Sequence, residues 1–169
     1  MKMRNKWESL SRLFPLGWPW QNEIMAAACA LALSALTALS LFAYQFGKAL
    51  DSLYYGTRPY RQLAPGTMVP PYPQVLGSAL LGFGLVALCL ILMPIGHFLW
   101  HRWGSRSDYL MRRLPRRQEL AKRCIAGPAL LLVITVLTGL VLFGLFFIWY
   151  QAATPAGHLP PDVWAVTGG

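Results

Sequence analysis

Three long apolar stretches, residues 24–46, 75–100 and 125–150, dominate the pattern of the chain, and none of them contains Asp, Glu, Lys or Arg. A helix needs about 20 apolar residues to cross about 30 Å of hydrocarbon. The stretches are apolar on all sides, and they are too long for buried strands. Short alternating segments of the kind that form a transmembrane barrel are missing. The pattern predicts an all-α membrane protein with three transmembrane helices.

Four polar segments flank these helices: residues 1–23, 47–74, 101–124 and 151–169. The first carries four of the fifteen Lys and Arg residues and the third carries eight, whereas the second has three and the tail has none. Short cytoplasmic segments of membrane proteins are enriched in Lys and Arg. We therefore expect the N-terminus and the loop 101–124 in the cytoplasm, and the loop 47–74 and the C-terminus on the extracytoplasmic side.

Composition agrees with a multi-pass protein of the cell membrane, which we expect to be a bacterial plasma membrane. Of 169 residues, 56% are hydrophobic and only 12% are charged, with a mean hydropathy of +0.43. The first apolar stretch is too long for the apolar region of a signal peptide. The net charge of +9 lies mostly where insertion and anionic membrane lipids favour it. No nucleic-acid-binding module accompanies it, so the sequence predicts no nucleic-acid partner.

Aromatic residues and prolines shape the flanking segments. The N-terminal segment predicts a short interfacial helix ending at Pro15, followed by two interfacial Trp anchors. The loop 47–74 is rich in Tyr and Pro, which predicts an irregular surface loop with its rings on the interface or on a partner. The tail is also expected to be irregular, with Trp164 folding back to the membrane. The N-terminal residues concerned are Trp7, Leu10, Leu13, Phe14, Trp18 and Trp20.

Small residues recur inside the apolar stretches. They let helix backbones approach closely where lipid gives no hydrophobic force between helices. They predict packing within the chain, or alternatively packing against another subunit. Pro94, followed by Gly96, predicts a static kink in the second helix. The small residues are Ala26, Ala30, Ser34 and Ala38 in the first stretch, Ser78 and Gly82 in the second, and Gly139 and Gly144 in the third.

Catalytic and metal-binding patterns are not evident. His97 and His101 share a helical face, but a metal site needs at least a third protein ligand, and His158 is expected on the other side of the membrane. The two histidines are therefore interpreted as interfacial side chains. The cysteines, at positions 29, 89 and 124, lack metal-binding or redox spacing and are expected to be free thiols. The sequence thus predicts no enzyme, cofactor or metal.

The basic loop 101–124 has more order than a simple charge cluster. Ser105 or Ser107 can cap a short helix, Pro115 should interrupt it, and a second helix can follow. Paired arginines beside apolar side chains suit carboxylates of a protein partner or phosphates of lipid, and both alternatives stay open. The predicted docking residues are Tyr109, Arg112, Arg113, Leu114, Arg116 and Arg117.

The run YLMRRLPR at residues 109–116, followed by Glu119, Leu120, Arg123 and Cys124, resembles a loop of small uncharacterised three-span membrane proteins of Firmicutes. Those proteins carry a basic YLMRRLP loop before their last apolar span and are associated with ABC-2 type exporters. The resemblance implies a non-catalytic accessory subunit, bound to an ABC permease and a separate ATPase. A homo-oligomeric transporter or channel, and an assembly or stability factor of another membrane complex, are the alternatives.

Overall fold

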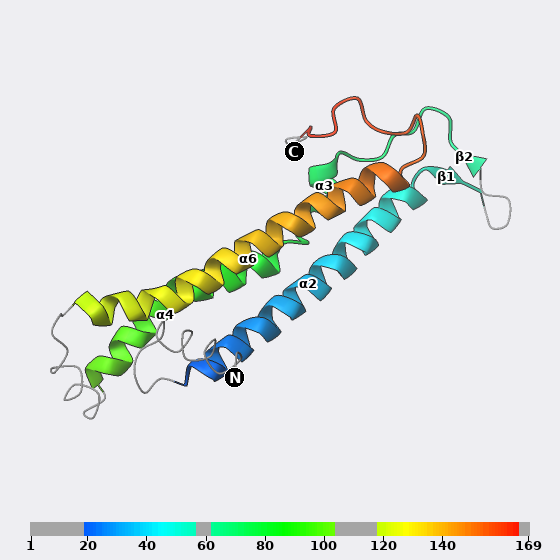
Figure 1. Ribbon diagram of the computed structural model, residues 1–169. Coiled ribbons are helices and arrows are strands. Elements are labelled where there is room, and N and C mark those ends of the chain that lie inside the picture. The colour runs from blue at the N-terminus through cyan, green and yellow to red at the C-terminus, as the bar shows by residue number, and fades with distance from the viewer. Residues whose placement is uncertain (1–18, 57–61, 104–117, 166–169) are drawn as a thin grey trace, which may run out of the picture. The chain divides into compact units, whose positions relative to one another are not determined.

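The computed structural model describes residues 19–56, 62–103 and 118–165, and these are mostly helical. Within them, three helices are long and apolar enough to cross a membrane, as the sequence predicts (Figure 1). Helix α2 spans Trp20–Asp51, α4 spans Leu81–Trp103 and α6 spans Gln118–Ala153. The interfacial helix predicted before Pro15 and the short helix predicted between Ser105 or Ser107 and Pro115 lie outside the described residues.

Both α2 and α6 extend beyond the apolar stretches that predict them. The α2 helix starts four residues earlier than expected and includes Glu23 in its first turn and Lys48 in its last turn. An acidic group at the N-terminus and a basic group at the C-terminus both interact favourably with the helix dipole. The α4 and α6 helices continue through Pro94 and Pro128, respectively. The flanking residues of the apolar stretches thus lengthen α2 and α6 at both ends.

The predicted start of the second membrane helix was wrong. Residues Tyr72–Leu76 form a separate short helix, α3, and α4 begins only at Leu81. Gly77 ends α3 with a φ of 47°, in the left-handed region that favours glycine. A side chain there would also lie 2.6 Å from Oε1 of Gln45. The chain therefore turns at Gly77 instead of continuing one long helix.

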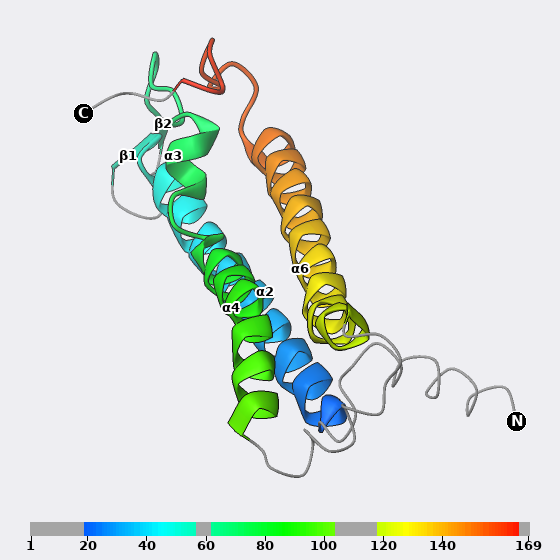
Figure 2. The ribbon, with the colours of Figure 1, turned by 90° about the vertical axis from the view of Figure 1, so that its left-hand side faces the viewer.

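The loop before α3 is more regular than predicted. Strands β1 (Tyr54–Tyr55) and β2 (Gln62–Leu63) pair antiparallel, with Tyr54 opposite Leu63, and Figure 2 shows this hairpin after the end of α2. Pro71 and Pro73 stand at the start of α3, where a missing backbone N–H breaks no helical hydrogen bond. The expectation of an irregular loop was therefore wrong at the hairpin and at α3, while residues 64–71 form no helix or strand.

The chain divides into two compact units. Unit 1 comprises Met1–Ala32 and Gly84–Leu137, so its described residues belong to the start of α2, most of α4 and the start of α6. Its apolar core contains Ala27, Leu90 and Leu131, one from each helix. Three partly buried side chains, Val86, Met93 and Leu132, pack against that core. Unit 1 is thus a small three-helix cluster.

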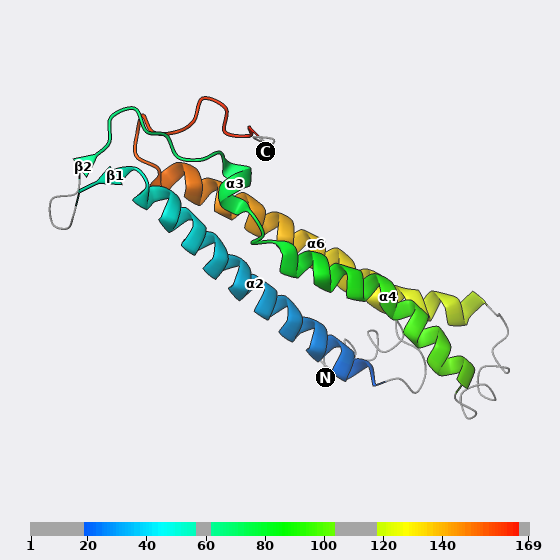
Figure 3. The same ribbon diagram turned by 180° about the vertical axis from the view of Figure 1, so that it is seen from behind.

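Unit 2 comprises Leu33–Phe83 and Thr138–Gly169. Aromatic rings fill its core: Phe42 of α2 stacks on Phe146 of α6 with ring centroids 4.4 Å apart and planes 6° from parallel. Phe42 also stacks on Phe46, which lies one turn later in α2. Figures 1 and 3 show the C-terminal tail, which belongs to this unit, running beside α3. Aromatic packing holds unit 2 together.

Candidate functional site

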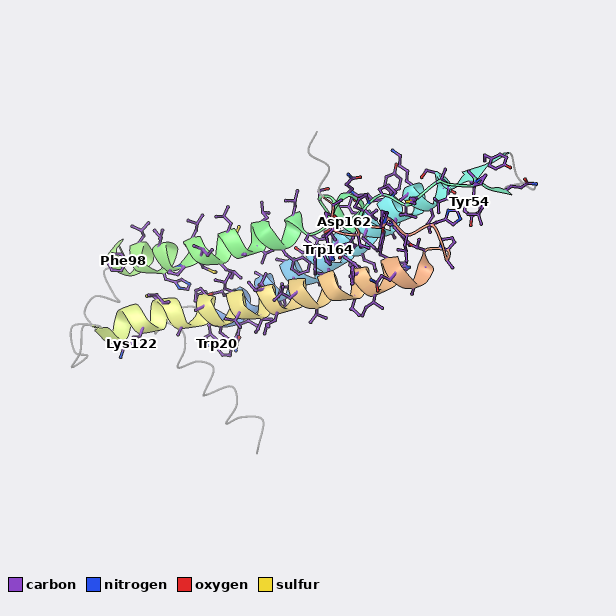
Figure 4. The ribbon with its side chains drawn as sticks, turned by 90° about the horizontal axis from the view of Figure 1, so that it is seen from above. Trp20, Tyr54, Phe98, Lys122, Asp162 and Trp164 are labelled. Carbon is purple, nitrogen blue, oxygen red and sulfur yellow. The ribbon has the colours of Figure 1, made fainter. Side chains whose placement is uncertain are left out.

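The predicted docking residues of the basic loop, positions 109–117, lie outside the described residues. The two helices that this loop joins are described up to Trp103 and from Gln118. Figure 4 shows Phe98 near the end of α4 and Lys122 near the start of α6, both in unit 1. The described residues closest to the basic loop are therefore those at the end of α4 and at the start of α6.

Part of the small-residue pattern lies at a close helix contact in unit 2. Ser34 and Ala38 of α2 are buried, and Ser34 lies beside Gly82 of α4. A Cβ added at Gly82 would stand 3.2 Å from Oγ of Ser34, closer than an ordinary van der Waals contact. Glycine therefore suits position 82 because the backbone of α4 comes close to α2 there.

The other small residues occupy looser positions. Ala26 and Ser78 are exposed, and Ala30 is half-buried. A Cβ at Gly139 would make an ordinary 3.8 Å contact with the ring of Phe83, and one at Gly144 would meet nothing within 4 Å. Gly144 is thus not a point of close approach among the described residues. The four-residue spacing from Ala26 to Ala38 does not follow one buried face, since Ala27 is buried in place of Ala26.

A buried polar cluster lies in unit 1, and its central residue is His97 of α4. The side chain is 1% exposed, so the interpretation of His97 as an interfacial side chain was wrong. Its Nε2 lies 3.1 Å from Oε2 of Glu23 in α2, whose side chain is also buried. Its Nδ1 lies 3.2 Å from the carbonyl oxygen of Cys124 in α6. One imidazole ring therefore joins all three helices of unit 1.

Pro128 explains why the carbonyl of Cys124 needs a partner. In an α-helix this carbonyl would accept a hydrogen bond from the backbone N–H four residues later. That residue is Pro128, which has no N–H and is fully buried. An unpaired carbonyl in an apolar interior costs about 1–3 kcal/mol. His97 supplies the missing donor, so the proline in α6 and the histidine in α4 act together.

The hydrogen bond to the Cys124 carbonyl identifies one nitrogen of His97 that carries a proton. A carbonyl oxygen only accepts, so Nδ1 of His97 is protonated and donates to Cys124. The short contact to Glu23 then holds one further proton, on either Nε2 of His97 or Oε2 of Glu23. Both arrangements have a net charge of zero, which suits a buried pair. The hydrogen bonds of His97 to Glu23 and Cys124, called the polar tie below, thus join the helices without adding net charge to the interior.

Sequence reasoning missed this cluster for identifiable reasons. Glu23 was placed in the flank because the uncharged stretch begins at residue 24, and His97 was considered only as a metal ligand together with His101 and His158. The available signal was the proline: Pro128 leaves a known carbonyl unpaired inside an apolar helix, and His97 is the strongest side-chain donor in the apolar stretch 75–100. A search for donors to that carbonyl would have pointed to His97.

In unit 2, the segment around α3 and the C-terminal tail form a hydrogen-bonded cap on α6. Tyr72 is fully buried; its hydroxyl donates to the carbonyl of Phe143 over 2.7 Å. Its backbone N–H donates to Val163 in the tail. Burial raises the pKa of Tyr72 from 10.0 to about 12. Tyr72 was expected at an interface with lipid or a partner, but it lies inside the cap.

Other bonds extend the cap along the tail. The Tyr150 hydroxyl donates to the carbonyl of Pro70 over 2.9 Å, and Nδ1 of His158 donates to the carbonyl of Thr67 over 2.7 Å. Trp164, labelled beside Asp162 in Figure 4, stacks on Phe143 and Phe147 of α6. The tail therefore folds back onto the helix that precedes it.

The cysteines take no part in either polar arrangement through their sulfur atoms. All three are free: Cys29 and Cys89 are exposed and Cys124 is buried. Within the described residues, no group of three or more His, Cys, Asp or Glu side chains is placed to hold a metal ion. Comparison with known proteins gave no match: no family model, curated protein or solved structure is significantly similar to this chain.

Proposed function

We propose that this chain is a non-catalytic accessory membrane subunit of an ABC-type exporter. In this proposal it packs on the permease and presents the basic loop 101–124 to the cytoplasmic side of the complex. The chain contains no phosphate-binding P-loop motif, so a separate polypeptide supplies the ATPase. The resemblance of residues 109–116 to the YLMRRLP loop suggests the transporter class.

The observation that carries the proposal is the hydrogen bond between His97 and Cys124. These residues are 27 positions apart and belong to the two helices that the basic loop connects. The bond from Glu23 to His97 adds α2 to the same tie. A docking loop binds more tightly when its ends are fixed, because less conformational entropy is lost on binding. The base of the loop is held in a way that suits docking.

An exposed face on α4 is available for packing against another membrane protein. Leu85, Leu88 and Ile95 are each more than half exposed, and Gly84 on the same helix leaves open space where a side chain would stand. Such a face contacts either lipid or a neighbouring subunit. A permease helix could approach closely at Gly84 and pack between the larger side chains.

The test is purification of the tagged full-length chain in mild detergent, followed by identification of bound proteins. We expect a permease and an ATPase to be recovered with it. Recovery of the chain alone contradicts the proposal, and a homo-oligomeric mass favours the small transporter or channel instead. Recovery of a different membrane complex favours an assembly factor.

A charge-reversal variant sharpens the test. Changing Arg112, Arg113, Arg116 and Arg117 to Glu should weaken the complex. The control changes Lys2, Arg4, Lys6 and Arg12 to Glu, which removes the same number of basic residues from the same side. Each variant keeps eight Lys and Arg on the expected cytoplasmic side against three outside, so the orientation should persist. Equal loss of partners in both variants contradicts a specific role for the loop.

A further inference from the structure

Unit 2 contains a cavity that the proposed function does not use. It has a volume of about 350 Å³ and lies between the last turns of α2 and the segment around α3. This volume is at the lower end of the range for small-molecule sites. Its lining residues include Gln45, Lys48, Ala49, Ser52, Pro70 and Val75.

Two hydrogen-bond donors are available at this cavity. Lys48 is exposed, and its ammonium group makes no ion pair within the part of the chain that the structure describes. Oε1 of Gln45 is buried without a hydrogen-bond partner, and the described residues give the amide nitrogen of the same side chain no acceptor. An ammonium and an amide N–H at one cavity favour an anionic oxygen.

The rest of the lining suits a ligand with an apolar part. Ala49, Pro70 and Val75 contribute apolar surface, and the Ser52 hydroxyl donates to the carbonyl of Ala49. Gln45 and Lys48 come at the end of the apolar stretch 24–46, where a spanning helix reaches the lipid headgroups. Phosphate groups of phospholipids lie at this depth, and lysine is a common phosphate-binding residue.

We propose that this cavity binds the phosphate of an anionic phospholipid headgroup, held by Lys48 and the Gln45 amide, with glycerol carbons against Pro70 and Val75. The site recognises a phosphate ester, which a soluble phosphate compound could also supply. Membrane depth favours the lipid. This inference depends on the chain spanning a membrane and is independent of the exporter assignment.

Native mass spectrometry of the full chain in detergent tests the site with three probes: phosphatidylglycerol, phosphatidylcholine and glycerol 3-phosphate. We expect phosphatidylglycerol to bind more tightly than phosphatidylcholine, whose quaternary ammonium group would add positive charge near Lys48. The substitution Lys48→Gln should weaken phosphatidylglycerol binding about fivefold, the upper range for an exposed ion pair. Gln45→Met should weaken it in the same direction.

Two control variants separate this site from general charge attraction. Lys122→Gln removes an exposed lysine from the start of α6 in unit 1, and Gln151→Met changes an exposed glutamine near the end of α6. Neither should alter the affinity. Equal binding by Lys48→Gln and the unchanged chain, or an equal loss in Lys122→Gln, overturns the proposal. Tight binding of glycerol 3-phosphate that depends on Lys48 supports the same site with a soluble ligand.

Discussion

The hydrogen bond between Glu23 and His97 predicts an energetic coupling between α2 and α4. Substituting Glu23 by Leu removes the carboxyl group and leaves Nε2 of His97 buried without it. Substituting His97 by Leu also removes the donor to the carbonyl of Cys124. The double variant removes the pair together, so the non-additivity of the three variants isolates the interaction between the two side chains.

The expected magnitude follows from burial and distance. Both side chains are almost fully buried and their polar atoms lie 3.1 Å apart. A lost hydrogen bond with a buried partner left behind costs about 1–3 kcal/mol, whereas interhelical bonds in membranes average about 0.6 kcal/mol with a maximum of about 1.7. We expect a coupling energy of about 1–1.5 kcal/mol. Glu23→Gln should cost less than Glu23→Leu, because its amide can donate to neutral His97.

Reversible unfolding in mixed micelles, followed by circular dichroism, measures these free energies for the four proteins of the cycle. A matched cycle with Met25→Leu, on the exposed face of α2, and His97→Leu provides the control and should be additive. Additive effects of Glu23→Leu and His97→Leu would refute the reasoning. A cost for Glu23→Gln as large as that for Glu23→Leu would show that the pair needs its ionic form.

Three other predictions use the same unfolding measurement. Pro128→Ala restores a backbone donor to the carbonyl of Cys124, so His97→Leu should cost about 1 kcal/mol less in that background; an unchanged cost contradicts the proline argument. Gly82→Val should destabilise by about 1–3 kcal/mol through overlap with Ser34, whereas Gly144→Val should be nearly neutral, and equal effects would contradict the close contact. Tyr72→Phe removes the hydrogen bond from the Tyr72 hydroxyl to the carbonyl of Phe143. Below pH 10 this should lower the free energy of unfolding by about 1 kcal/mol. Since burial raises the pKa of Tyr72 from its ordinary value of 10.0 to about 12, its contribution is present below pH 10 and is lost as the pH rises to about 12. The stability advantage of the unchanged chain over Tyr72→Phe should therefore fall by up to about 1.4 kcal/mol per pH unit in that window, which is enough to cancel the advantage of about 1 kcal/mol and reverse its sign before pH 12, and a constant difference would contradict the raised pKa.

Hydropathy predicts the three long helices because crossing the hydrocarbon core depends on the summed hydrophobicity of many residues, and no single residue decides it. The ends of the helices depend on a few backbone positions, and there the prediction failed. The break before α4 results from the positive φ of Gly77, while Gly82, Gly84 and Gly96 lie inside the same helix without breaking it. A glycine permits a turn without requiring one. Its effect depends on neighbours such as Gln45, which come from a distant part of the chain.

The cap in unit 2 escaped prediction for a related reason. Tyrosines and prolines in the loop 47–74 indicate low helix propensity, which is a local property. Burial of Tyr72 depends on acceptors and rings 71 or more residues away in α6, together with a backbone acceptor in the tail. No local pattern distinguishes Tyr72 from Tyr54 or Tyr55, which are exposed on the hairpin. Which tyrosine is buried depends on where the contacting residues of α6 and the tail lie, and only the folded structure shows their positions.

Pro128 differs from these cases because its consequence can be deduced from the sequence. A proline inside a helix leaves the carbonyl four residues earlier without its usual donor, and an apolar environment provides no water to replace that donor. The number of side-chain donors in the apolar stretches is small, and histidine is the strongest one present in the second stretch. Once His97 donates through Nδ1, its Nε2 needs a second partner, and Glu23 is the acidic residue closest to the first apolar stretch. Each step follows from satisfying one buried polar group, so the same reasoning can locate polar ties in other apolar helices that contain a proline.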